Sequence, residues 1–358
     1  SKEEIEVNNH GVDLPILLDQ ATSVVTTSDA GGGVGYTGIR VRGSDATRVN
    51  VTINGIPFND AEGQGVYWVN MPDLSSSIDD IQIQRGVGAS TTGASAFGAS
   101  INLSTLSTIN SYKPYGEIST SYGSFNTLKN TIKVGTGLID GKWNFEGRLS
   151  KIASDGFIDR ASSDLNSYYF SGSYLGEKTS IQALVFSGNE KTYQSWGGTP
   201  LRVLDTNQTY NPYSYDNQVD NYTQTHYQLH LTNKPTKRIK LNASLHYTRG
   251  FGYYESFKDG EALSDYNLNN IISTFPSDTV FHIDTVGPNQ MDSTMYITDQ
   301  DTLEISSSDI INRKWLDNHF YGIVYSAEYN ADKFQLILGG GANQYLGCLL
   351  YTSPSPRD

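Results

Sequence analysis

The sequence predicts a mainly β protein, in which a small α+β domain precedes an up-and-down antiparallel transmembrane β-barrel. The chain of 358 residues contains 35 Gly and 24 Tyr, a composition that favours strands and turns over helices. After about Leu106, long segments alternate apolar and polar side chains with a period of two. The connections between these segments alternate between long and short, as in an outer-membrane barrel.

Charge and cysteine content exclude several classes of protein. Lys and Arg total 25 against 38 Asp and Glu, a net charge of −13, so no nucleic-acid partner is expected, because phosphate binding needs a basic surface. The only cysteine, Cys348, allows neither a disulfide framework nor a cysteine-based zinc site. No apolar stretch is long enough for a transmembrane helix, and the charged start, Ser1–Glu4, is not a signal peptide. Either the protein is cytoplasmic or its start is missing.

The N-terminal part predicts one short helix and a glycine-rich turn. The helix is expected over Leu14–Ala21, with Pro15 in its first turn. Gly33–Gly38 matches the GxGxxG pattern of dinucleotide-binding proteins, but the strand-like Ile39–Gly43 follows where that fold requires a helix. No Lys-Ser or Lys-Thr pair follows, which excludes a P-loop. A nucleotide site is therefore not predicted.

Val49–Leu103 is the stretch around which the first domain is organised. Alternating apolar residues flank Asn54-Gly55, a dipeptide that accepts positive φ and predicts a tight turn. A short strand ends at Arg85-Gly86, and Gly86–Ser100 consists almost entirely of small side chains. Small side chains let backbone approach backbone, which suits packing in a confined place.

Nine strands are predicted after this domain. The clearest is Lys237–Thr248, which has apolar side chains on one face and polar ones on the other. The remaining strands are expected at Tyr115–Phe125, Leu128–Gly137, Trp143–Ser150, Tyr168–Leu175, Thr179–Gly188, Gln224–Leu231, Tyr321–Tyr329 and Phe334–Asn343.

The connections between these strands favour a membrane barrel over a soluble β-sandwich. Asn189–Asn221 and Gly250–Asn318 are long, whereas Gly176–Lys178 and Asn233–Thr236 are short and fall at the opposite end. A sandwich is not expected to sort its loops in this way, and the many Tyr residues suit the aromatic girdles of a barrel. Phe251–Trp315 holds eleven acidic residues against three basic ones, and we expect it to be a solvated, mobile extracellular loop.

Four motifs within Val12–Leu106 resemble the plug domain of TonB-dependent outer-membrane receptors, and the strands that follow look like the start of the barrel of that family. The second motif has Asn54 where the family usually has Asp, a change that keeps the turn. In sequence order the motifs are IRVRG (Ile39–Gly43), VTINGIP (Val51–Pro57), IDDIQIQRG (Ile78–Gly86) and AFGASINL (Ala96–Leu103).

This resemblance implies a plug inside a barrel of about 22 strands, so nine strands are expected to be an incomplete barrel and the chain a fragment. The expected organisation is an N-terminal lead-in over residues 1–11 whose start is missing, a plug domain over 12–108, the first barrel strands over 109–347 and a non-native tail over 348–358. Leu349–Asp358 resembles adapter read-through and holds two prolines where a strand should continue.

By the same resemblance the protein lies in the cell outer membrane, in contact with the lipid bilayer and lipopolysaccharide. It would import a scarce nutrient by plug rearrangement, powered by the TonB complex of the inner membrane, with no cofactor and no enzymatic reaction. A ferric siderophore or similar iron complex is the first candidate ligand. A glycan or peptide, delivered with a surface lipoprotein, is the alternative within the family. A passive porin and a soluble β-sandwich adhesin are the alternatives from other classes.

Candidate site residues follow from the pattern and from the resemblance. The sequence predicts no catalytic site. On an extended strand, His226 and His230 would lie about 13 Å apart, which is too far to share a metal ion. The resemblance implies that plug arginines contact carboxylates of the barrel wall. The expected plug–barrel contacts are Arg40, Arg42 and Arg85; the turn and backbone positions are Asn54, Gly55, Pro57, Gly86 and Gly98; and the ligand-binding residues are Gln64, Tyr67, Trp68, Tyr193 and Trp196.

Overall fold

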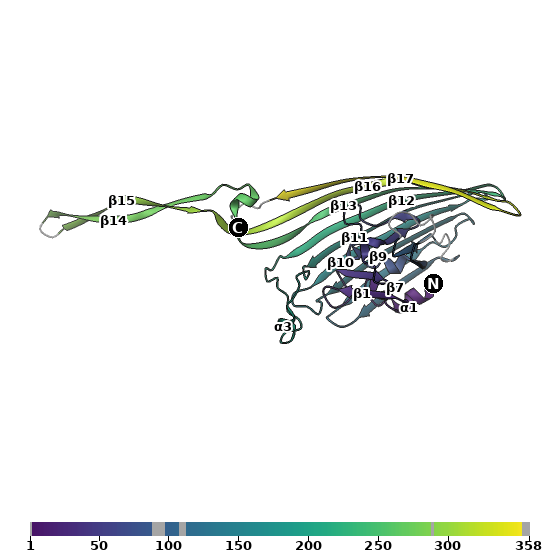
Figure 1. Ribbon diagram of the computed structural model, residues 1–358, viewed down its shortest axis with the longest axis horizontal. Helices are drawn as coiled ribbons and strands as arrows, with labels where there is room; N and C mark the ends of the chain where they lie inside the picture. The colour runs from purple at the N-terminus through teal and green to yellow at the C-terminus, as the bar shows by residue number, and fades with distance from the viewer. Residues whose placement is uncertain (1, 88–96, 107–111, 288–289, 353–358) are drawn as a thin grey trace. The chain divides into compact units, whose positions relative to one another are not determined.

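The computed structural model describes residues 2–87, 97–106, 112–287 and 290–352. The chain divides into two compact units, one built from Ser1–Tyr254 with Lys314–Leu350 and the other centred on Glu255–Arg313. The first unit contains a small mixed domain, coloured purple to blue in Figure 1, and most of a nine-stranded antiparallel sheet. We refer to the small domain as the plug and to the nine-stranded sheet as the wall.

The plug has a four-stranded mixed sheet with the order β4-β3-β6-β5. Its inner strand β3 is buried along its whole length, because β4 and β6 flank it and its apolar side chains belong to the core of the plug. The other elements surround this sheet. They are α1 (Lys2–Asn8), α2 (Leu14–Leu17), the β1–β2 hairpin (Val24–Ser28, Thr37–Val41), η1 (Ala46–Arg48), β3 (Val49–Ile53), β4 (Ile56–Pro57), η2 (Trp68–Asn70), η3 (Leu74–Ser77), β5 (Asp80–Arg85) and β6 (Ala99–Ser104).

The predicted turn joins β3 to β4. Asn54 and Gly55 have φ values of 57° and 78°, the positive values that a tight hairpin turn of this type requires. The predicted helix is shorter than expected, because only Leu14–Leu17 is helical and Leu18 closes its C-terminal end. The sequence reading missed helix α1, which has one buried apolar residue, Ile5.

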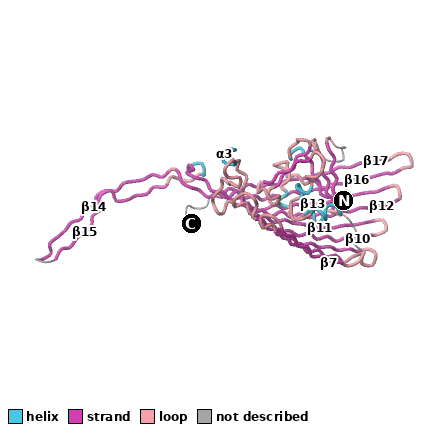
Figure 2. The backbone as a smooth tube through the Cα atoms, turned by 90° about the horizontal axis from the view of Figure 1, so that it is seen from below, coloured by secondary structure: helices cyan, strands magenta, loops and turns pink. Residues whose placement is uncertain are grey.

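The wall is an up-and-down meander, as the spacing of the alternating segments predicts. Its order is β17-β16-β13-β12-β11-β10-β9-β8-β7, and Figure 2 follows these neighbouring strands. A short helix, α3 (Leu201–Leu204), lies in the connection after β11. The strands are β7 (Tyr115–Tyr122), β8 (Leu128–Gly135), β9 (Trp143–Ser154), β10 (Ser163–Leu175), β11 (Thr179–Tyr193), β12 (Val219–Thr236), β13 (Ile239–Ala262), β16 (Ser307–Asn330) and β17 (Gln335–Thr352).

The two faces of the wall differ in polarity in the sense expected of a membrane barrel. On β12, Tyr227 and Leu229 are 48% and 43% exposed, whereas the intervening His226 and Gln228 are each 5% exposed and face the plug. A soluble sandwich would bury the apolar set instead. Among the described residues, no helix combines the length and the apolar character needed to cross a lipid bilayer.

Two segments differ from the sequence prediction. Much of Phe251–Trp315 is strand rather than mobile loop: β13 extends to Ala262, β16 begins at Ser307, and β14 (Ile271–Gly287) pairs with β15 (Gln290–Ile305). A 3₁₀ turn, η5 (Leu263–Tyr266), follows β13. Strand β17 runs to Thr352, beyond the point where the side-chain alternation ends, because backbone pairing does not require that alternation; residues 353–358 lie outside the described residues.

Candidate functional site

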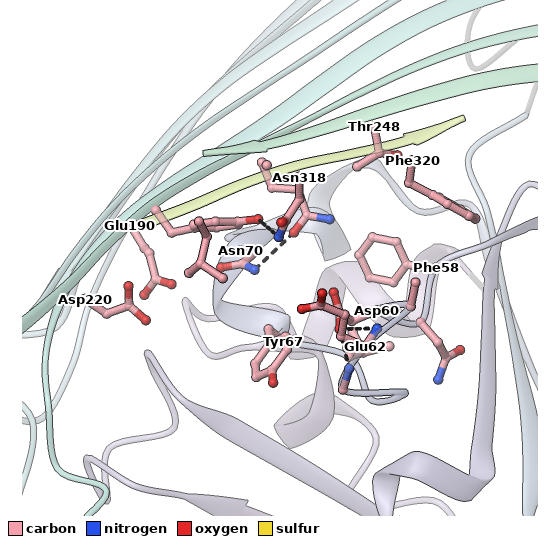
Figure 3. A pocket seen from close by; sticks show the side chains of 18 of the residues that line it. Phe58, Asp60, Glu62, Tyr67, Asn70, Glu190, Asp220, Thr248, Asn318 and Phe320 are labelled. Carbon is pink, nitrogen blue, oxygen red and sulfur yellow. Dashed lines mark hydrogen bonds between the residues drawn. The ribbon is translucent and has the colours of Figure 1, made fainter. Parts of the chain in front are cut away.

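A cavity of about 550 Å³ lies between the plug and the wall. The plug supplies Asp29, Tyr36, most of the segment from Pro57 to Tyr67, and Asn70. The wall supplies residues of β11 and β12 and residues from β13, β16 and β17. Figure 3 shows the side chains of both parts directed into the same space. Because the long connections follow β11 and β13, the cavity lies at the end of the wall that faces outward in an outer-membrane barrel.

The plug side of the cavity is a loop that is held by its own hydrogen bonds. Asp60 accepts from the backbone N–H of Glu62 at 3.0 Å, and its own N–H donates to the carbonyl of Gly65 at 2.8 Å. Asn59 ties the loop to β3, because its Oδ1 accepts from the N–H of Val51 at 2.7 Å. The loop between β4 and η2, which we call the apex loop (58–67), therefore presents its side chains from a fixed backbone.

Aromatic rings surround one side of the cavity. The ring of Trp196 meets that of Tyr36 edge to face, with centroids 5.1 Å apart, and lies 6.0 Å from that of Tyr254. Phe58 of the apex loop, which also lines the cavity, lies 5.3 Å from the ring of His226. Rings with polar tips are well suited to bind a ligand that has both apolar and polar parts.

The cavity is acidic. Among the described residues that line it, none is Lys or Arg. Burial, together with the nearby carboxylates of Glu190 and Asp220, raises the pKa of Tyr36 well above its ordinary value, so its hydroxyl stays protonated and donates to Asp220. The five carboxylates of the lining belong to Asp29, Asp60, Glu62, Glu190 and Asp220.

A buried group of charges outside the cavity lining joins the plug to the wall. Asp73, immediately before η3, lies 2.6 Å from Nζ of Lys129 on β8 and 3.2 Å from a guanidinium nitrogen of Arg148 on β9. All three side chains are at most 4% exposed. Although burial alone would raise the pKa of Asp73, Arg148 and Lys129 hold it well below its ordinary range. We refer to these three residues as the charge triad.

Neighbouring polar groups complete the hydrogen bonding of the triad. Thr131 donates to Asp73 at 2.9 Å, and Ser150 donates to the same carboxylate oxygen. From the N-terminal end of the plug, Asn9 accepts from Nζ of Lys129 at 2.8 Å and donates to Oγ of Ser76 at 2.8 Å. A buried charge group is stable only when its hydrogen bonds are satisfied, and here the plug and the wall both contribute to them.

Close backbone contact and two amide pairs also seat the plug. Asn54 donates to Oε1 of Gln228 at 2.9 Å, and Asn70 donates to Oε1 of Gln224 at 3.0 Å. Gly188 of β11 lies directly against the plug, because a Cβ at this position would overlap the carbonyl of Asn70. The wall residue has to be glycine for the plug backbone to approach this closely.

The three predicted plug arginines lie on the exposed surface of the plug. Arg40 is in β2, Arg42 follows it with a φ of 51°, and Arg85 ends β5. Among the described residues, none of the three forms an ion pair with a wall carboxylate. Their predicted contact with wall carboxylates stays a prediction. The ion pairs of Asp73 with Lys129 and Arg148 have the opposite polarity, with the acid on the plug and the bases on the wall.

The predicted backbone positions lie in turns and close contacts. Gly86 has a φ of 83° and its N–H donates to the carbonyl of Gly98 at 2.7 Å. A Cβ at Gly98 would overlap the side chain of Ser44. Asn54 and Gly55 form the β3–β4 turn, and Pro57 ends β4 and lines the cavity. The residues between Gly86 and Gly98 lie mostly outside the described residues.

Of the predicted ligand-binding residues, the structure brings Tyr67 and Trp196 together in the cavity lining. Gln64 is exposed on the apex loop but outside that lining. Trp68 is 3% exposed and belongs to the apolar core of the plug. Tyr193 is 6% exposed and donates to the carbonyl of Tyr215 at 2.8 Å, which fixes it within the wall.

Sequence reasoning missed the carboxylates of the cavity and the charge triad. Glu190 and Asp220 are inward-facing acids on strands of alternating pattern, a signal that was available for the polar face. Asp73, Lys129 and Arg148 have no comparable local signal, since their association depends on how the plug docks. Within the described residues, no cluster of three or more His, Cys, Asp or Glu side chains is arranged to hold a metal ion.

Known proteins share this architecture, in which a plug domain precedes a sheet of barrel strands. Residues 1–100 match the family model of the TonB-dependent receptor plug domain. The whole chain is similar in fold to the copper transporter OprC, with a TM-score of 0.64 at 12% identity over 98% of this chain and 48% of that one. It is also similar to the ferric citrate transporter FecA in its unliganded form, with a TM-score of 0.57 at 15% identity over 96% of this chain and 58% of that one.

A third solved structure, the siderophore receptor PirA from Acinetobacter baumannii, gives a TM-score of 0.54 at 12% identity over 94% of this chain and 48% of that one. The chain thus spans about half the length of the solved structures it matches. Its first 100 residues match the plug domain of TonB-dependent receptors, and the chain as a whole has the fold of a plug followed by part of a barrel. TonB-dependent receptors, the family of the matched plug model, are outer-membrane proteins.

Proposed function

We propose that this protein imports a scarce nutrient by binding it in the cavity between the apex loop and the wall. The observation that carries the proposal is that one outward-facing cavity is lined by both parts, with Tyr67 from the plug and Trp196 from a long connection. A ligand that binds there contacts the element that has to move for transport. The volume of the cavity, about 550 Å³, is in the range of small-molecule sites.

The charge of the cavity restricts the nutrient. An iron complex remains the first candidate, but a strongly anionic one would be repelled by the apex-loop carboxylates of Asp60 and Glu62. We therefore propose an iron complex without net negative charge, such as a ferric trihydroxamate. Aromatic rings supply the apolar contact that such a complex needs.

Transport then requires the plug to shift within the wall. We propose that the inner-membrane TonB complex supplies the energy and that no bond in the nutrient is made or broken. The plug is held to the wall by polar and ionic contacts such as Asp73–Lys129 and Asn70–Gln224, which water can replace once the interface opens. The apolar outward face of the wall would contact the lipid bilayer, with lipopolysaccharide in its outer leaflet.

The uptake of radioactive iron tests this proposal. Cells that produce the protein should accumulate iron from a ferric trihydroxamate, and the accumulation should stop in cells that lack TonB. A ferric tricatecholate, which carries several negative charges, serves as the matched complex and should be taken up poorly. Equal uptake from both complexes, or uptake that does not depend on TonB, would contradict the proposal.

A glycan or peptide is the second candidate, and the acidic, ring-lined cavity also favours it. Trp196 and Tyr254 can stack on a sugar or a side chain, while Asp60 and Glu62 can accept hydrogen bonds from hydroxyl or amine groups. Such a ligand would be passed on by a surface lipoprotein partner. Binding of neutral oligosaccharides or short peptides, with no binding of iron complexes, would select this candidate.

We also propose the division of the chain into a lead-in over residues 1–11, a plug over 12–108 and barrel strands over 109–347. The end of β6 at Ser104 and the start of β7 at Tyr115 support the second boundary. The contact of Arg40, Arg42 and Arg85 with carboxylates of the barrel remains part of this proposal.

A further inference from the structure

Two buried carboxylates of the wall beside the cavity each have one oxygen without a hydrogen-bond partner. Glu190 is 1% exposed and Asp220 is 7% exposed, and both line the cavity. Within the described part of the chain, neither Oε1 of Glu190 nor Oδ1 of Asp220 has a hydrogen-bond partner. A buried carboxylate oxygen without a partner is costly, and a native structure retains it where a ligand completes the bonding.

The two carboxylates lie close together on neighbouring strands. Thr192 is directly opposite Asp220 in the β11–β12 register. Glu190, two residues before Thr192 on β11, is therefore the diagonal neighbour of Asp220 on the same face. Figure 3 shows both side chains at the same side of the cavity. Their other oxygens are already engaged, since Glu190 accepts from Thr192 at 2.8 Å and Asp220 accepts from the hydroxyl of Tyr36. Each side chain is therefore fixed by one oxygen and keeps the other unpaired beside the cavity.

Aromatic rings lie next to this pair. The ring of Tyr36, whose hydroxyl is bonded to Asp220, contacts the ring of Trp196 with centroids 5.1 Å apart. A carboxylate pair beside aromatic faces is the environment that binds an organic cation, because carboxylates accept its N–H groups and the rings attract its charge. The described residues contain no third metal-binding side chain here, which favours a nitrogen cation over a metal ion.

We propose that Glu190 and Asp220 form a subsite for a positively charged nitrogen group of the nutrient, an ammonium or a guanidinium. This inference rests on the proposed function in that it takes the cavity to be the nutrient site. It goes further by assigning the residues that recognise the cation. The subsite would select, among complexes of the same size, those that carry a primary amine.

A charge series on one carbon chain tests the subsite without depending on iron. We would titrate the detergent-solubilised protein with putrescine, 1,4-butanediol and succinate, four-carbon compounds whose ends are cationic, neutral and anionic, and follow binding by calorimetry. Putrescine should bind at least about tenfold more tightly than the diol, because charge-assisted hydrogen bonds are the stronger ones, and succinate should not bind.

Substitution of the carboxylates assigns the effect to the subsite. Glu190→Gln with Asp220→Asn keeps the side-chain shapes and should reduce putrescine binding to the level of the diol. Asp164→Asn is the matched control, because Asp164 is 51% exposed on β10 and pairs with Lys151 away from the cavity. Equal binding of all three compounds, or unchanged putrescine binding in the double variant, would overturn the inference.

A second pair of probes separates this inference from the proposed function. Ferrioxamine B is a ferric trihydroxamate with one primary ammonium, and its N-acetylated form lacks that charge. Tighter binding of the ammonium form, by about tenfold, supports both proposals. Equal binding of the two complexes leaves the iron proposal standing and overturns the subsite. Binding of neither, together with a preference for putrescine, leaves the subsite standing and overturns the iron proposal.

Discussion

The carboxylate of Asp73 in the plug lies 2.6 Å from the ammonium of Lys129 in the wall, and both side chains are almost fully buried. Arg148 approaches the same carboxylate from the next strand. One plug acid thus compensates two wall cations. The interface is sensitive to the loss of that acid, because each cation would then be buried without its counter-charge.

Replacement of Asp73 by Asn should release the plug from the wall. We expect the free energy of local plug unfolding to fall by about 3–5 kcal/mol, the usual cost of breaking a buried ion pair on one side. Hydrogen exchange of the β3 amides measures this free energy. Asp164→Asn, which breaks the exposed pair with Lys151, should cost less than about 1 kcal/mol. Equal effects of the two substitutions would contradict the role of the triad.

A methyl group at Gly188 should displace the plug without damaging the strand. The Cβ of Gly188→Ala would overlap the carbonyl of Asn70, so η2 has to move away from β11. We expect faster proteolysis of the plug at unchanged β content in circular dichroism. Gly116→Ala on β7 is the matched control, because a Cβ there meets no atom within 4 Å. Protection of the plug in Gly188→Ala equal to that of the control would show that the contact is not required.

Plug stability should decrease as the pH rises from about 4 to 7. Burial raises the pKa of Asp13 from 3.8 to about 7, although Thr37 donates to its carboxylate at 3.1 Å. The folded plug therefore holds a proton in this range that the unfolded chain has lost. Linkage gives a stabilisation that is complete below pH 3.8 and decreases by at most about 4 kcal/mol by pH 7.

Asp13→Asn should remove this dependence, as measured by hydrogen exchange of plug amides between pH 4.5 and 8. Asp19→Asn is the control, because Asp19 is exposed and its substitution should leave the slope as in the unaltered protein. A slope that persists in Asp13→Asn would assign the effect to other groups.

Trp196→Phe should weaken nutrient binding. The smaller ring loses part of its contact with Tyr36 and Tyr254, and aromatic pairs of this kind contribute about 0.5–1.5 kcal/mol. We expect the dissociation constant of the ferric trihydroxamate to rise about 3- to 10-fold in fluorescence titrations. Trp143→Phe on β9 should leave it unchanged, because Trp143 is 45% exposed beside Phe145 and Tyr174, outside the cavity lining. A larger loss from the β9 substitution would place the binding surface elsewhere.

The wall was predictable because the bilayer imposes a simple local rule. Tyr227 and Leu229 point outward while His226 and Gln228 point inward, and this alternation is visible residue by residue. The same rule failed in Phe251–Trp315, because the sequence there has no sustained alternation of apolar and polar residues although much of it is strand. The Asn54-Gly55 turn was predictable because its conformation depends on only two residues.

The site was only partly predictable, because its contacts join residues that are far apart in the chain. Tyr36 bonds to Asp220, 184 residues away, and nothing near either residue indicates the other. Tyr67 and Trp196 could be selected by residue type alone, whereas Trp68 has the same chemistry but lies in the core. Which aromatic residue faces a cavity depends on how the plug docks against the wall. The residues next to it in the sequence do not indicate this docking.

The position of Asn9 sets an order for mechanical failure. Its amide joins the N-terminal end of the plug to Lys129 at 2.8 Å and to Ser76 at 2.8 Å. A load applied ahead of Asn9 would reach these bonds before it reached the pairing between β3 and β6, and each is worth only about 0.5–3 kcal/mol. Tension would therefore detach α1 first. It would then break the hydrogen bond between Asn9 and Lys129, and only afterwards strain the plug sheet. The contacts of the N-terminal end of the plug would therefore break before those of the charge triad.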